Sequence, residues 1–124
     1  IIALNEAITF VLKLGVENIY NYERELLEYA TNEILKIKGV VIYGNSKNKT
    51  GIISFNINGL HPYDIGVIID KLGVAIRTGH HCTQPLMERF KIPGTARISF
   101  AVYNTIEEID ICIEAIKKAK SMLV

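Results

Sequence analysis

The residues with the most obvious chemistry gather in one short stretch, Arg77 to Pro85, which reads Arg-Thr-Gly-His-His-Cys-Thr-Gln-Pro. It places the thiol of Cys82 directly after the imidazoles of His80 and His81. A cysteine acts as a nucleophile in its thiolate form, which cationic and hydrogen-bonding neighbours favour, whereas inert cysteines usually have apolar surroundings. The stretch therefore predicts that Cys82 is a reactive thiol. The alternative is a structural cysteine that happens to lie in a loop.

The two histidines also raise the question of a metal site. Three consecutive residues cannot converge on one ion without strain, and zinc motifs space their ligands by two or more residues. His61 stands alone at a predicted helix start. The sequence therefore predicts no metal site. One of the two histidines, His80 or His81, then either tunes the Cys82 thiol or relays protons near it, or merely hydrogen-bonds the loop backbone. Gly79 permits a backbone turn that other residues resist.

Arg97 is a second candidate, because it lies in an otherwise apolar stretch, Ala96 to Phe100. A guanidinium binds a carboxylate through two parallel hydrogen bonds, so an arginine here is suited to fixing an anion. The alternative is an internal ion pair with one of the thirteen acidic residues. Arg77, at the end of the strand that leads into the Cys82 loop, has the same two interpretations.

Composition limits the other classes of function. The chain has 124 residues and a formal net charge of +1, and 49% of it is hydrophobic, which indicates one soluble domain. A charge near zero gives no reason to expect nucleic acid or an anionic membrane as a partner. No signal peptide and no transmembrane helix are expected. Two cysteines then predict free thiols in the cytoplasm, with a Cys82–Cys112 disulfide as the alternative.

Hydrophobic periodicity predicts the elements that must position these residues. Helices are expected over residues 1–14, 17–38, 62–72 and 85–90, and strands over 40–43, 51–57, 74–77 and 96–101. Thr105 and Glu108 fit a capping box for a last helix, whose apolar stripe includes Cys112 and predicts a buried, inert thiol there. This order predicts an α+β domain, with a mainly antiparallel sheet of about three to four strands and helices on one face.

The start of the chain is unusual. It opens Ile1-Ile2-Ala3-Leu4 inside an apolar helical pattern, whereas a free N-terminus is usually polar and frayed. We therefore expect a fragment in which residues 1–124 form one domain and residues 1–14 are the end of a helix that connects to a missing upstream part.

Three stretches together carry a family resemblance: Arg77 to Met87, then Ala96-Arg97-Ile98-Ser99, then Tyr103-Asn104-Thr105 followed by Glu108-Ile109. They resemble the C-terminal small domain of SufS-type (group II) cysteine desulfurases, pyridoxal-phosphate (PLP) enzymes of the class V aminotransferase superfamily. The resemblance covers essentially the whole chain, and the His-His-Cys loop is its most specific part.

The resemblance implies that Cys82 takes sulfur from L-cysteine, leaving L-alanine and a persulfide on Cys82. It implies that Arg97 holds the substrate carboxylate and that Arg77 also contributes to substrate binding. Gly79, His80 and His81 match positions of the supporting loop, and the resemblance assigns no specific role to either histidine. The lysine and the other groups that hold PLP belong to a large N-terminal domain. No cofactor-binding residue is therefore expected in this fragment, which should be inactive alone.

The implied partners are a SufE- or SufU-like sulfur acceptor that serves iron–sulfur cluster assembly, and a second copy in a homodimeric parent. Two alternatives remain open at this point. One is a selenocysteine lyase or another class V enzyme of the same architecture. The other is a non-catalytic α+β binding module.

Overall fold

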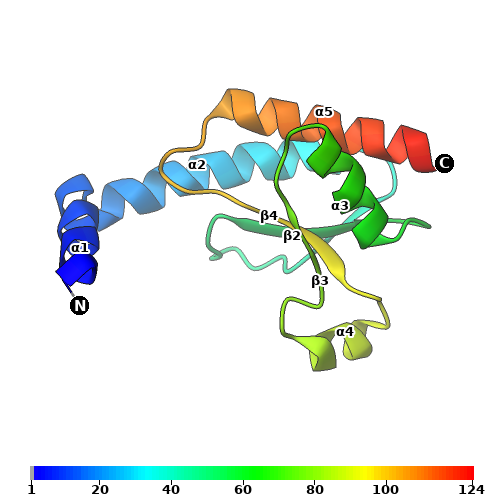
Figure 1. The fold of residues 1–124 in the computed structure, drawn as a ribbon, viewed down its shortest axis with the longest axis horizontal. Coiled ribbons are helices and arrows are strands. Elements are labelled where there is room, and N and C mark those ends of the chain that lie inside the picture. Colours follow the sequence, from blue (N-terminus) through cyan, green and yellow to red (C-terminus); the bar gives the residue numbers. More distant parts are fainter. Residues whose placement is uncertain (1) are drawn as a thin grey trace.

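A computed structural model describes residues 2–124; Ile1, the first residue of the first predicted helix, lies outside them. Five helices and four strands follow one another along this part of the chain (Figure 1). Their bounds are α1 Ile2–Leu14, α2 Val16–Leu35, β1 Val40–Tyr43, β2 Ile52–Ile57, α3 Pro62–Lys71, β3 Arg77–Gly79, α4 Gln84–Phe90, β4 Thr95–Ser99 and α5 Ile106–Leu123.

The strands form one four-stranded sheet in the order β1-β2-β4-β3, and all neighbouring pairs are antiparallel. Strands β2 and β3 therefore run parallel to each other, joined through α3, with β4 inserted between them. The predicted α+β class and the antiparallel sheet are confirmed. The insertion matters for function, because it places β4, which carries Arg97, beside the strand that leads to Cys82.

The main core lies between the sheet and three helices, α2, α3 and α5, which cover one face (Figure 1). Ile53, Phe55 and Ile57 of β2 point into this core and are 2% exposed or less. Each such side chain contributes roughly 1.5–3 kcal/mol by leaving water. The predicted apolar stripe of α5 is buried there too, Cys112 included. The short helix α4 lies on the opposite side of the sheet (Figure 1).

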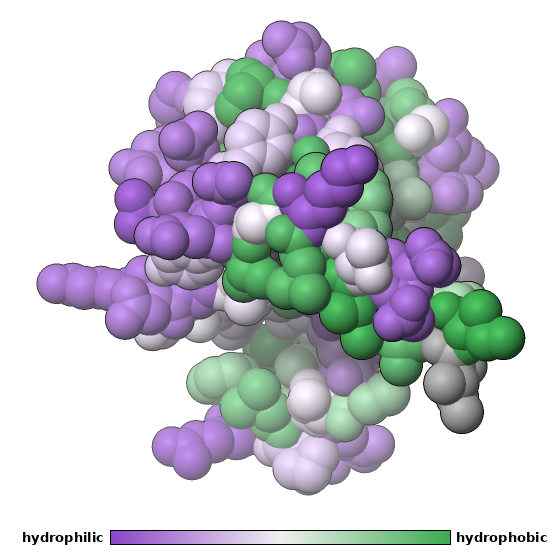
Figure 2. Space-filling model, turned by 90° about the vertical axis from the view of Figure 1, so that its left-hand side faces the viewer, coloured by the Kyte–Doolittle hydropathy of each residue, from purple (hydrophilic) through white to green (hydrophobic). Residues whose placement is uncertain are grey.

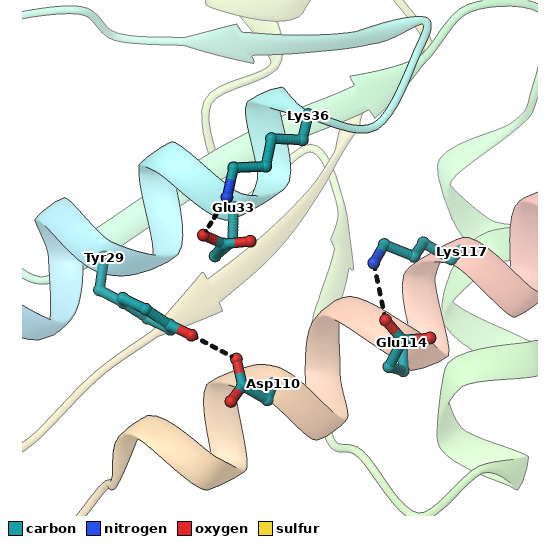
Figure 3. Close-up of polar contacts among 6 residues, drawn as sticks. All are labelled: Tyr29, Glu33, Lys36, Asp110, Glu114 and Lys117. Atoms are coloured by element: carbon teal, nitrogen blue, oxygen red, sulfur yellow. Dashed lines mark hydrogen bonds and ion pairs between the residues drawn. The ribbon is translucent and has the colours of Figure 1, made fainter.

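Polar contacts on the outer surface connect α2 to α5, and one ion pair lies at the C-terminal end of α2 and another within α5 (Figure 3). The Tyr29 hydroxyl of α2 donates to Asp110 Oδ1 of α5 over 2.6 Å. This hydrogen bond is the main reason why the pKa of Tyr29 rises to about 12. At the start of α5, the predicted capping box is present: Glu108 N–H donates to Thr105 Oγ1, and the Glu108 carboxylate accepts from Thr105 N–H.

Two predicted boundaries are wrong, for local reasons. The third strand is expected at 74–77 but lies at Arg77–Gly79, because the Val74 N–H closes the end of α3 on the Ile69 carbonyl (3.2 Å). The second helix is expected to reach residue 38 but ends at Leu35. There, hydrogen bonds from Lys36 and Ile37 to carbonyls three residues back tighten the chain.

Helix α1 differs from the other long helices because none of its described residues is buried. It projects from the end of the molecule beside the start of α2 (Figure 1), and hydrophobic side chains gather on this end in Figure 2. Its exposed large apolar side chains are Ile2, Leu4, Ile8, Phe10, Val11, Leu12 and Leu14. Even so, no helix among residues 2–124 combines the length and apolar character needed to cross a membrane.

Candidate active site around Cys82

Cys82 occupies a tight turn, residues 80–83, between β3 and α4. The Thr83 N–H donates to the His80 carbonyl over 2.9 Å, and the Thr83 hydroxyl donates to the same oxygen over 2.7 Å. Both central residues have left-handed backbones, with φ of 53° at His81 and 61° at Cys82. Non-glycine residues avoid this region at a cost of order 1–3 kcal/mol each. The surrounding structure must therefore hold the turn in place.

The turn carries the thiol into solvent. Cys82 is exposed, and both cysteines are free, which rejects the Cys82–Cys112 disulfide. The Arg77 Nη2 donates to Cys82 Sγ over 3.9 Å. A cationic side chain of β3 therefore lies in contact with the sulfur. Cys82 is thus exposed and next to a charged side chain, and its reactivity stays a prediction.

Arg77 and Arg97 lie directly opposite each other in the β3–β4 register, and Ser54 lies opposite Arg97 on its other side. Alternation along each strand places these side chains on the sheet face away from the main core. Within residues 2–124, the ion pairs are Glu33–Lys36 and Glu114–Lys117, so neither arginine is paired with an acid there. Arg97 Nε is buried without a hydrogen-bond partner. The internal ion pair is thus rejected, and Arg97 remains available for an anion.

A cavity of about 350 Å³ opens between α4 and this face of the sheet. Its polar wall carries Arg97, and its apolar wall includes the Tyr43 and Phe90 rings, whose centroids are 5.6 Å apart. The remaining lining residues are Gly44, Ile52, Ser54, His81, Thr83, Leu86, Met87 and Thr95. The cavity has the size and charge for a small carboxylate ligand. Its described lining contains no lysine, so these residues do not offer an amine to an aldehyde cofactor such as PLP.

The two histidines of the loop have different roles in the structure. His81 places its Nε2 3.0 Å from both the carbonyl and the hydroxyl oxygen of Thr95, and partial burial is the main cause of its lowered pKa. His80 is exposed, and its ring makes no hydrogen bond to another described residue. His61 caps α3 by accepting from Tyr63 N–H. Among residues 2–124, no three His, Cys, Asp or Glu side chains gather as a metal site would require.

The sequence pattern missed the residues that support the loop from β2 and β4. Asn56, in the buried part of β2, donates from Nδ2 to the Gly94 carbonyl over 2.8 Å. A Cβ on Gly94 would lie 2.8 Å from the Gly79 carbonyl oxygen, so only glycine permits this approach of the two strands. Thr95 follows and is 1% exposed. The signals in the sequence that could have found them are the polar residue Asn56 within an apolar strand and the glycine Gly94 just before the next strand.

Fold and site together define a small α+β domain that presents a solvent-exposed cysteine in contact with Arg77, which in turn lies opposite Arg97 in the sheet. Comparison with known proteins agrees with this class. The chain belongs to the aminotransferase class-V family, whose model matches residues 1–112. A probable cysteine desulfurase of Staphylococcus epidermidis is 46% identical over 120 residues, which are 96% of this chain and 29% of the relative. A probable cysteine desulfurase of Staphylococcus aureus is 45% identical over the same shares.

Solved structures give the same result. The apo structure of a cysteine desulfurase from Thermococcus onnurineus is 35% identical, has a TM-score of 0.86 and matches 94% of this chain and 29% of its own. The cysteine desulfurase CsdA of Escherichia coli is 27% identical with a TM-score of 0.88, over 95% of this chain and 29% of its own. The resemblance to class V cysteine desulfurases is therefore confirmed. The chain spans about 29% of the length of these relatives.

Proposed function

We propose that this chain is the cysteine-bearing domain of a PLP-dependent cysteine desulfurase of the SufS type. In this proposal, Cys82 takes sulfur from L-cysteine and leaves L-alanine. The observation that supports it most directly is the exposed Cys82 thiol on a left-handed turn, 3.9 Å from Arg77 Nη2 and next to the cavity that Arg97 lines. A buried cysteine in a rigid helix has neither the access nor the cationic neighbour that such a reaction needs.

In the transfer step, one covalent bond forms and one breaks. The Cys82 thiolate attacks the substrate sulfur, and a sulfur–sulfur bond forms while the carbon–sulfur bond of the substrate breaks. The electron pair of the broken bond and one proton end on the carbon that becomes the alanine methyl group. PLP supplies the electron sink for this cleavage. The side chains that bind PLP are proposed to come from another part of the full-length protein, because the cavity described here offers no lysine.

Each arginine has a distinct role in this proposal. Arg97 lines the cavity with a buried, unpartnered Nε and no competing acid, so its guanidinium is proposed to hold the substrate carboxylate. Arg77 contacts the sulfur of Cys82 and is proposed to orient it, and to contribute to substrate binding at the mouth of the site. Gly79 supports the loop by its left-handed φ of 114°.

Exposure of the loop also fits an onward transfer of sulfur. An acceptor thiolate attacks the outer sulfur of the Cys82 persulfide, so a new sulfur–sulfur bond forms on the acceptor while the bond to Cys82 breaks and Cys82 leaves as its thiolate. This exchange requires an accessible sulfur. We propose that the acceptor is a SufE- or SufU-like protein serving iron–sulfur cluster assembly, that the parent enzyme is a homodimer, and that it works in the reducing cytoplasm.

The test is the release of alanine from L-cysteine by the full-length protein under a reductant. Cys82→Ala is expected to lower kcat by at least about a thousandfold, since removing the nucleophile of a covalent mechanism can cost considerably more than this, while the visible band of PLP stays. Cys112→Ala is the matched control and should retain activity. A Cys82→Ala enzyme that releases alanine at the wild-type rate would refute the role of Cys82, whereas a wild-type protein that binds PLP but releases no alanine would favour another class V reaction or a non-catalytic module.

A further inference from the structure

The His81 side chain connects the Cys82 turn to the sheet. Its Nε2 lies 3.0 Å from the Thr95 carbonyl oxygen and 3.0 Å from the Thr95 hydroxyl. Thr95 is the first residue of β4, is 1% exposed, and lies opposite Gly79 in the β3–β4 register. The imidazole therefore reaches from the turn, across the end of β3, to a buried residue of the neighbouring strand.

The environment of the ring indicates which nitrogen carries the proton. His81 Nδ1 is buried and has no hydrogen-bond partner. A proton on Nδ1 would leave a buried donor unpaired, which costs about 1–3 kcal/mol. The proton therefore belongs on Nε2, where it is donated to the Thr95 carbonyl, and the ring is neutral.

The turn needs such an external anchor. Two consecutive non-glycine residues, His81 and Cys82, keep left-handed backbones that they would leave if released. Within the turn, the hydrogen bonds of Thr83 close its ends but do not attach it to the sheet. The ring of the neighbouring His80 makes no hydrogen bond to another described residue, so the other polar side-chain contact from the turn to the sheet is the longer one, 3.9 Å, between Arg77 Nη2 and Cys82 Sγ.

We propose that His81 is a positioning residue for sulfur transfer: its hydrogen bond to Thr95 holds the left-handed turn against β4 and so fixes the place of the Cys82 thiol relative to the cavity lined by Arg97. The inference rests on the proposed function. It differs from a proton relay through His81, in which a titrating imidazole would be required and an amide in its place would fail.

The first experiment needs only this chain. Hydrogen exchange of the Thr83 amide, which closes the turn, is followed with the buried core amide of Ile113 as an internal reference for global unfolding. His81→Ala and His81→Gly are expected to accelerate exchange at Thr83 at least tenfold relative to Ile113. His81→Gln, whose amide can donate to the Thr95 carbonyl, should remain within about threefold of wild type, and the control His80→Ala should not change.

Glycine makes this test stringent, because it adopts a positive φ without steric cost. If His81→Gly keeps slow exchange at Thr83, the backbone alone holds the turn and the proposal is overturned. It is equally overturned if His80→Ala accelerates exchange as much as His81→Ala does, because the loop would then depend on no particular anchor.

The second experiment separates positioning from proton transfer in the full-length enzyme. His81→Ala is expected to lower kcat for L-cysteine at least tenfold with KM within about twofold, and His81→Gln should restore kcat to within about threefold. A His81→Gln enzyme as slow as His81→Ala would assign a proton-transfer role instead. If Cys82→Ala retains activity, the proposed function fails, whereas the exchange result on this chain still decides whether His81 anchors the turn.

Discussion

The two cysteines of this chain have opposite surroundings. Cys82 stands exposed on a left-handed turn with the Arg77 guanidinium 3.9 Å from its sulfur. Cys112 lies on the apolar stripe of α5, is 7% exposed, and burial raises the pKa of its thiol to about 11. The same side chain is thus available for chemistry at one place and part of the core at the other. The comparison teaches that solvent access and charged neighbours, rather than residue type, decide which thiol reacts.

The largest expected effect is in thiol modification. At pH 8, a thiol with a pKa near 11 is thiolate to about one part in a thousand, before its burial slows access further. Because Cys112 also lies in the core at 7% exposure whereas Cys82 is exposed to solvent, iodoacetamide should modify Cys82 in the native chain at least about a hundredfold faster than Cys112. Mass spectrometry of timed samples measures both rates, with a denatured sample as the control in which both react. Comparable modification rates for the two cysteines in the native chain would mean that Cys112 does not lie in the core.

A medium effect is expected for stability when each sulfur is replaced by a hydroxyl. Cys112→Ser places a polar group among apolar neighbours and should lower the free energy of unfolding by about 1–3 kcal/mol. Cys82→Ser, at an exposed position, should change it by less than about 0.5 kcal/mol. Denaturant unfolding followed by circular dichroism measures the pair. An equal loss in both variants would contradict the assignment of Cys112 to the core.

The smallest expected effect concerns the helix that shelters Cys112. Thr105→Ala removes the cap of α5 and should cost about 1 kcal/mol. Because that amount corresponds to roughly a fivefold change in the population of open states, modification of Cys112 through opening should rise about fivefold, while Cys82 should react at its wild-type rate. Thr50→Ala, at a position outside any helix, serves as a control that should leave both rates unchanged.

Local patterns were enough to predict most elements and the main site residue. The alternation in β2, the capping box at Thr105 and the stripe around Cys112 each depend on residues a few positions apart, and all three are confirmed. Boundaries failed where a hydrogen bond to another element took over, as when Val74 closes α3 instead of extending β3. The site residues that were missed, Asn56 and Gly94, act through contacts across the sheet.

The sequence by itself determined which of the two cysteines has polar neighbours, because that character is encoded in adjacent positions, and it thereby singled out Cys82 as the candidate reactive thiol. Only the tertiary structure decided how that thiol is held and what lies beside it. The pairing of β3 with β4 brings Arg77 opposite Arg97 and brings His81 onto Thr95, although twenty and fourteen residues separate them along the chain. Such contacts depend on strand order and register, which arise from packing the whole sheet against its helices rather than from any local run of residues.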